Sequence, residues 1–129
     1  MAFEMLHIAN TSLGMHQTWL DALANNIANV NTVSATDEDA FQAEMVRAQA
    51  RPDGGVDVVG IEYGDAEGRL VYSPDHPLAD EQGMVRAPDI DMGAQMSALV
   101  MAQRGFQASV QVTKNAQDPY NSALQIGRA

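Results

Sequence analysis

The sequence is poor in the residues that build disulfides, nucleic-acid surfaces and membrane spans. It has no cysteine, which excludes disulfides and thiolate metal sites. Only 7 of its 129 residues are Lys or Arg, against 17 Asp or Glu, and the resulting net charge of −10 argues against nucleic acid as a main partner. There is no run of about 18 apolar residues, so we expect no direct membrane insertion. Nor does the chain open with a basic segment and an apolar block, and we expect no cleaved signal peptide.

The common catalytic and metal-binding motifs are also missing. The sequence has no EF-hand spacing, no His-Glu-x-x-His pair, no phosphate loop, no dinucleotide fingerprint and no nucleophile elbow. Asp75, His76 and Asp80 lie close in sequence, and solvated turn residues explain them better than a hydrolytic or metal site does. We therefore predict a protein that is not an enzyme and has no catalytic residues, metal, cofactor or small-molecule substrate.

The acidic residues are concentrated in the middle of the chain. Residues 1–30 carry a net charge of −2, residues 31–90 carry −9, and residues 91–129 carry +1. This division predicts two ends that pack against protein and a central segment that faces water.

The longest regular pattern lies near the C-terminus, between Asp91 and Gln117. Its apolar residues follow a heptad, the alternating three-and-four spacing of a coiled-coil seam. One position holds Met92, Leu99, Phe106 and Thr113, and we assign Met96, Gln103, Val110 and Gln117 to the partner position. The other faces carry Ala, Ser, Gln and Met rather than charges, which predicts protein contacts on more than one side.

A second heptad occupies the first thirty residues. Leu6, Leu13, Leu20 and Ile27 are spaced seven apart, and Ala9, His16, Leu23 and Val30 each follow three residues later. Asn and Thr on the remaining faces are mediocre helix formers, so this helix needs partners. We expect His16 to be a packed histidine rather than a metal ligand.

The central segment has the composition of short strands and turns. Residues 31–40 predict a loop, and strands are predicted over Phe41–Arg47, Val56–Tyr63, Arg69–Tyr72 and Met84–Ala87. Asp89 or Asp91 is expected to cap the following helix. At Pro119 that helix either kinks or stops and restarts.

These elements predict an α+β fold. Residues 1–32 and 89–129 form two long helices that pair as an antiparallel coiled coil, and residues 33–88 form a small β-rich insert between them. The residues expected at the helix pairing and at subunit interfaces are Leu6, Leu13, Leu20, Leu23, Ile27, Val30, Met92, Met96, Leu99, Phe106 and Val110.

Both ends of the sequence resemble one family. Residues 23–32, LANNIANVNT, and residues 101–112, MAQRGFQASVQV, resemble the terminal signatures of the bacterial flagellar basal-body rod and hook proteins. Residues 72–85 and 88–92 resemble the proximal rod members. The positions that match the signatures are Ala24, Asn25, Asn26, Ala28, Asn29, Thr32, Gln103, Arg104, Gln107 and Ala108. Ser109 stands where the family usually has Asn, and the acidic Val33–Ala40 and Pro119 also depart from its pattern.

The resemblance implies a structural subunit of the flagellar rod. Such subunits leave the cytoplasm unfolded through the flagellar type III export apparatus and assemble helically in the periplasm with themselves and other rod subunits. Their terminal helices form the tube that transmits torque and lines the export channel, and the insert decorates its outside. The competing hypotheses are a soluble helical adaptor or export chaperone, a hydrolase or metal enzyme using the acidic insert, and a monomeric helical hairpin.

Overall fold

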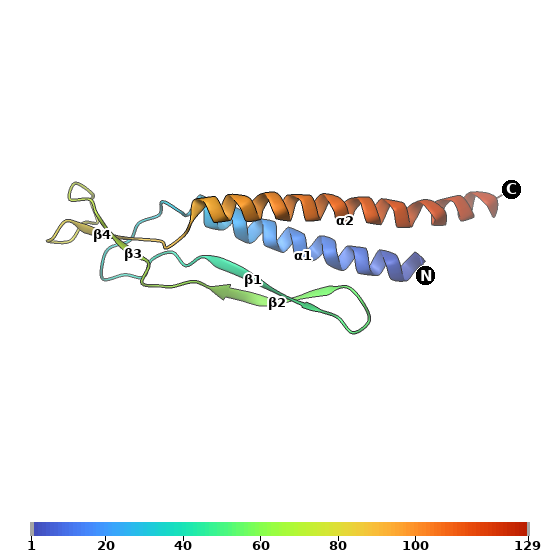
Figure 1. Cartoon of the computed structure of the whole chain (residues 1–129), viewed down its shortest axis with the longest axis horizontal. Helices are drawn as coiled ribbons and strands as arrows, with labels where there is room; N and C mark the ends of the chain where they lie inside the picture. The colour runs from blue at the N-terminus through green and yellow to red at the C-terminus, as the bar shows by residue number, and fades with distance from the viewer. Residues whose placement is uncertain (1, 129) are drawn as a thin grey trace.

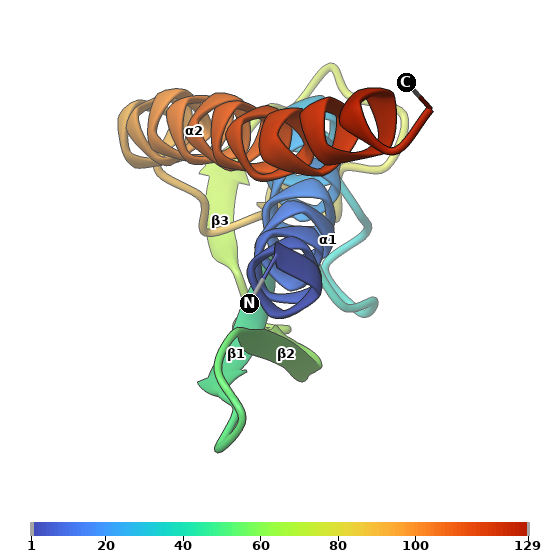
Figure 2. The ribbon, with the colours of Figure 1, turned by 90° about the vertical axis from the view of Figure 1, so that its right-hand side faces the viewer.

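The computed structural model describes residues 2–128, which form two long helices and two pairs of antiparallel strands. Helix α2 (Met92–Ile126) lies over helix α1 (Ala2–Ala28), and α1 lies over a hairpin of β1 (Glu44–Ala50) and β2 (Val56–Tyr63) (Figures 1 and 2). A second pair, β3 (Arg69–Tyr72) and β4 (Met84–Ala87), lies at one end of the molecule. The predicted α+β class is confirmed.

The two helices run antiparallel, so both ends of the described chain lie at the pole opposite β3 and β4 (Figure 1). Three contacts fix their register. Phe3 meets Tyr120 with ring centroids 5.5 Å apart, the hydroxyl oxygens of Ser12 and Ser109 are 2.7 Å apart, and Asn26 Nδ2 donates to Gln95 Oε1 at 3.0 Å. As the residue numbers increase along α1, the numbers of the α2 residues that they contact decrease, as expected for antiparallel helices.

Small side chains occupy the centre of this helix interface. On α2 the buried residues are Ala102, Ser109 and Ala116, which are spaced seven apart. The assignment of Met96, Gln103, Val110 and Gln117 to the partner heptad position is therefore wrong by one residue, and Met96, Gln103 and Gln117 are exposed. Small residues let helix axes approach closely, which leaves the larger apolar side chains at the flanks.

On α1 the buried residues include both small and larger side chains. Ala9 and Leu23 are buried, in agreement with the second predicted heptad series. Leu6, Leu13, Leu20 and Ile27 are only half-buried, on the flank of the interface. Ala22 and Asn26 are buried instead, because α1 also packs against the β1–β2 hairpin.

Helix boundaries follow from local hydrogen bonds. The Asp91 carboxylate accepts from the Ala94 backbone N–H at 3.2 Å and caps α2, which selects Asp91 over Asp89. At the end of α1, the Asn25 carbonyl accepts both the Asn29 backbone N–H at 3.1 Å and Asn29 Nδ2 at 2.9 Å, so the Asn29 side chain reinforces the last turn. α2 continues through Pro119, so the helix does not stop and restart there.

Both strand pairs are antiparallel, and the boundaries predicted for β2, β3 and β4 are confirmed. β1 begins three residues later than predicted. Residues Ala40–Ala43 instead bond to the turn before β3: the Ala40 N–H donates to the Ala66 carbonyl, and the Gly64 N–H donates to the Ala43 carbonyl, each at 2.8 Å. Residues 41–43 of the predicted strand therefore belong to a connector, while residues 44–47 pair with β2 as predicted and the strand continues to Ala50.

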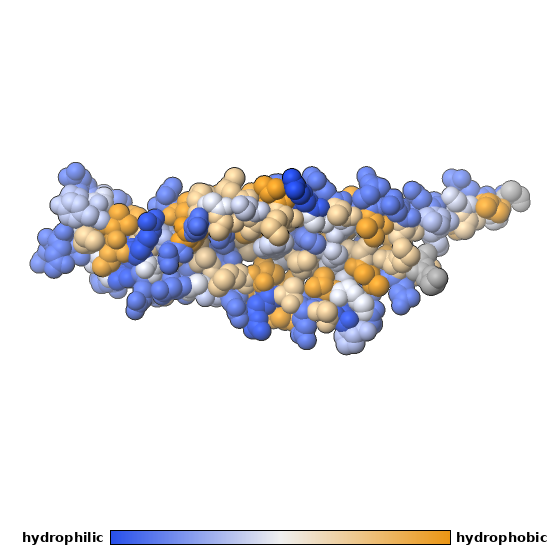
Figure 3. All heavy atoms as spheres, in the orientation of Figure 1, coloured by the Kyte–Doolittle hydropathy of each residue, from blue (hydrophilic) through white to orange (hydrophobic). Residues whose placement is uncertain are grey.

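The core of the described chain is thin. Six of the nine buried apolar residues are alanines, and the largest side chains that are almost fully buried are Val85, Asn26 and Pro88. None of the helices in residues 2–128 is both long enough and apolar enough to cross a membrane. Because the core is thin, much of the apolar surface remains on the outside of the two helices, along the face seen in Figure 3.

Candidate assembly surface

Helix α2 carries apolar side chains on the side that faces away from α1. Among them Met96 is 47% exposed and Val100 is 44% exposed, and Met92 is also exposed. Among the helices and strands of residues 2–128, α2 packs only against α1, so its outer face meets no other helix or strand there. A solvated helix normally carries charge there, and this surface instead has the chemistry of a protein contact.

A groove of about 340 Å³ runs along the flank of the helix pair. Met5, Ile8 and Ala9 of α1 line one wall, and Ala108 and Val112 of α2 line the other. The Ser12–Ser109 hydroxyl pair lies at its floor. No charged side chain lines the groove, so its chemistry favours an apolar side chain.

Asn26 joins three elements of the fold. It is almost fully buried, and its Nδ2 donates to the Glu44 carbonyl at 2.9 Å as well as to Gln95. Its Oδ1 accepts from the Glu44 N–H at 2.7 Å. One amide thus ties α1 to the start of β1 and to α2, and Asn25 adds a bond from its Nδ2 to the Glu44 carboxylate at 2.9 Å. Sequence reasoning identified both residues from the family signature and gave no reason for them.

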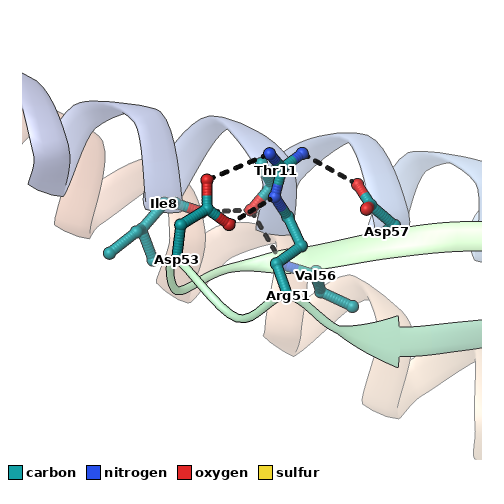
Figure 4. Close-up of polar contacts among 6 residues, drawn as sticks. All are labelled: Ile8, Thr11, Arg51, Asp53, Val56 and Asp57. Carbon is teal, nitrogen blue, oxygen red and sulfur yellow. Dashed lines mark hydrogen bonds and ion pairs between the residues drawn. The ribbon is translucent and has the colours of Figure 1, made fainter.

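The tip of the β1–β2 hairpin docks onto the outer side of α1 (Figure 4). Thr11 Oγ1 accepts from the Val56 N–H at 3.1 Å, while its own hydroxyl donates to the Ile8 carbonyl at 2.7 Å. Gly54 and Gly55 have φ values of +87° and +89°, and a Cβ on Gly55 would come within 2.5 Å of Thr11 Oγ1. Only glycine combines this backbone conformation with so close an approach to the helix.

An ion cluster stiffens the same tip. Arg51 contacts the carboxylates of Asp53 and Asp57, each at 3.0 Å. The hydrogen bond from Arg51 lowers the pKa of Asp53, and the two carboxylates raise the pKa of Arg51. Both carboxylates are exposed and Arg51 is half-buried, so the cluster shapes the turn more than it stabilises the fold.

Asp80 and His76 of the insert stabilise turns through hydrogen bonds from backbone N–H groups. The Asp80 carboxylate accepts from the backbone N–H groups of Gln82 and Met84, each at 2.9 Å, and from the Thr36 hydroxyl at 3.1 Å. These bonds, led by that from Met84, lower the pKa of Asp80. His76 Nδ1 accepts from the Leu78 N–H at 3.1 Å. Within residues 2–128, no three His, Asp or Glu side chains are grouped so that they could hold a metal.

The structure distributes the residues singled out from the sequence over three environments. Leu23 and Asn26 are buried. Half-buried are Leu6, Leu13, Leu20, Asn25, Ile27, Asn29, Val30, Leu99, Phe106 and Val110. Exposed are Ala24, Ala28, Thr32, Met92, Met96, Gln103, Arg104, Gln107 and Ala108. His16 is half-buried in the seam, where its Nδ1 lies 2.8 Å from the Ser12 carbonyl and its ring fills the space above Gly105.

Comparison with known proteins matches the whole chain. The chain is 34% identical to the flagellar basal-body rod protein FlgC of Yersinia enterocolitica over 130 residues, which cover 97% of each protein. It is 30% identical to the FlgC protein of Salmonella typhimurium, again over 97% of each. This chain belongs to the flagellar basal-body rod protein family.

More distant rod proteins align over the same extent. The Bacillus subtilis FlgC protein is 26% identical over 148 residues, covering 98% of this chain and 99% of that protein. The family model for the C-terminal region of the flagellar basal-body rod FlgEFG proteins matches residues 81–126, which contain β4 and all of α2. The family resemblance seen in both terminal segments is thereby confirmed.

Proposed function

We propose that this chain is a structural subunit of the flagellar basal-body rod, assembled with copies of itself and with other rod subunits through its two terminal helices. The observation that carries this proposal is the full-length match to rod proteins of a chain whose α2 keeps exposed methionine and valine side chains along its outer face. A match across the whole chain does not favour the adaptor or chaperone alternative.

Assembly would complete the small core of the free chain. The α1–α2 interface is centred on alanine and serine, so each subunit buries little apolar surface by itself. A contact between unlike patches, repeated without closure, generates a helical filament. In this arrangement the helices form the wall of the export channel and carry torque across many contacts, and the hairpin and the β3–β4 pair lie outside.

The same proposal covers the route to the rod. The subunit leaves the cytoplasm through the flagellar type III export apparatus and reaches the periplasmic basal body. Its role is mechanical, with no catalysis and no cofactor. The signature residues Gln103, Arg104, Gln107 and Ala108 are exposed and would contact neighbouring subunits.

Replacing Met96 with Glu tests this function. The side chain is half in solvent already, so the fold should keep its circular dichroism spectrum, while a charge at a buried subunit contact should weaken that contact by about 2 kcal/mol or more. In a bacterial strain lacking this subunit, the wild-type chain should restore swimming and Met96→Glu should not. Met45→Glu is the matched control, because Met45 is 49% exposed and lies on the hairpin. Equal motility of the two folded variants would refute assembly through α2.

A further inference from the structure

The last turns of α2 extend beyond the start of α1, the helix that packs against the rest of α2. Tyr120 meets Phe3, close to the start of α1, and residues 121–126 continue the helix past that point (Figure 1). Leu124 is 53% exposed there, and Arg128 lies beside it in the same surface patch. Leu124 and Arg128 are four residues apart and so share one face, the Leu124 face. Arg128 is the only charged residue in residues 119–128.

We infer that the Leu124 face of one copy docks into the apolar groove between Met5, Ile8, Ala108 and Val112 of a second copy. This inference rests on the proposed rod function and names a contact through which the copies join. Residues 121–126 of α2 span about 8 Å along the helix axis, which fits within the α1 wall of the groove, about 10 Å from Met5 to Ser12. Leu124 supplies the apolar side chain that the groove walls require.

Charge at the groove rim favours the same occupant. Glu4 precedes Met5 at one end of the groove. With Leu124 in the groove, Arg128, which lines the same surface patch as Leu124, is placed to pair with Glu4. The pair is exposed, so it orients the helix and adds little affinity.

The occupant must come from another molecule. Val112 and Leu124 lie on one continuous helix and are about 18 Å apart along its axis, so a chain cannot fold its own end into its own groove. The groove and the Leu124 face are different patches, which makes the contact heterologous and able to repeat from copy to copy.

Disulfide trapping tests the contact, because the natural chain contains no cysteine. Val112→Cys and Leu124→Cys are introduced together, and the protein is oxidised at high concentration. A disulfide requires Cα atoms within about 7 Å, so a bridge between these positions cannot form within one chain. We expect a ladder of dimers, trimers and larger species on a non-reducing gel.

The matched control pairs Val112→Cys with Ile126→Cys. Ile126 is 77% exposed, more than Leu124, and lies on the opposite side of α2, since two residues rotate the helix by about 200°. We expect at least tenfold less ladder from the control pair. Equal ladders, no ladder, or bridges only to a different rod protein would overturn the docking assignment.

A motility assay distinguishes failure of the docking contact from failure of the proposed rod function. If Leu124→Cys with Val112→Cys restores swimming in a strain lacking the subunit and yet forms no ladder, the docking assignment fails and the rod function stands. If the cysteine-free chain cannot restore swimming at all, the proposed function fails first.

Discussion

At the scale of single residues, Asn26 shows what a signature asparagine does in this fold. It is a buried amide whose donors and acceptor are all used, by Glu44 on one side and Gln95 on the other. An apolar side chain there would leave the Glu44 N–H without its partner next to a packed helix junction.

Asn26→Ala should therefore lower the free energy of unfolding by about 2 kcal/mol, within the range of about 1–3 kcal/mol for a buried polar group that loses its partner. Urea denaturation followed by circular dichroism measures the change. Asn10→Ala on the exposed side of α1 is the control and should be neutral or slightly stabilising, because Ala has the higher helix propensity. Equal effects at the two positions would contradict a stabilising role for the hydrogen bonds of Asn26.

Asp80 gives a pH dependence whose sign follows from its hydrogen bonds. Its pKa is lowered in the folded chain, chiefly by the Met84 N–H. The stabilisation is therefore present above the ordinary Asp pKa of about 3.9 and is lost as the pH falls through the lower folded value. We expect the Met84 amide to exchange faster with solvent below about pH 4, and Asp80→Asn to flatten this dependence. Asp75→Asn should leave it unchanged, because the Asp75 carboxylate accepts no hydrogen bond within residues 2–128.

At the scale of elements, the hairpin tip and α1 form one unit. Thr11 Oγ1 accepts a hydrogen bond from the Val56 N–H. In the same turn, Gly54 packs against Ile8 and Gly55 packs against Thr11. The hairpin thereby covers the side of α1 that α2 leaves open.

Thr11→Val keeps the shape of the side chain and removes the acceptor. We expect it to lower stability by about 1 kcal/mol and to speed hydrogen exchange at the Val56 amide. Thr18→Val is the matched control, because the Thr18 hydroxyl also bonds within α1, to the Gly14 carbonyl, and the mutation removes no hydrogen bond to the hairpin. Unchanged exchange at Val56 in Thr11→Val would show that the turn is held without this bond.

The sequence predicted the positions of the helices and strands better than it predicted which of their faces are buried. β2, β3 and β4 were located correctly because β-branched residues end at glycine-, proline- and aspartate-rich turns. The α2 seam was misplaced by one residue because heptad reasoning gives weight to Met96 and Val110, whereas the structure buries Ala102 and Ser109. Small or polar residues give a weak hydrophobic signal, and only the register with α1 reveals them. The role of Asn26 depends on residues 18 and 69 positions away and has no local signal.

At the scale of the whole molecule, two helices share a narrow alanine-rich interface. A chain that buries so little apolar area has little free energy to set against its conformational entropy. The free subunit should then hold its terminal helices loosely.

Hydrogen exchange on dilute monomer measures this. We expect weak amide protection over residues 5–30 and a helical circular dichroism signal that rises with protein concentration, because neighbouring copies supply the missing contacts. Amides in β3 and β4 serve as the internal reference, since buried Val85 anchors that end within the chain. Full, concentration-independent protection of residues 5–30 would contradict this expectation.

The antiparallel arrangement of α1 and α2 has a practical consequence for imaging. An affinity tag or fluorescent protein fused to either end would arrive at the same pole, beside the Phe3–Tyr120 contact, and would obstruct the surfaces proposed for assembly. The turn between β3 and β4, at residues 74–82, projects from the far pole and is the better place to insert a label.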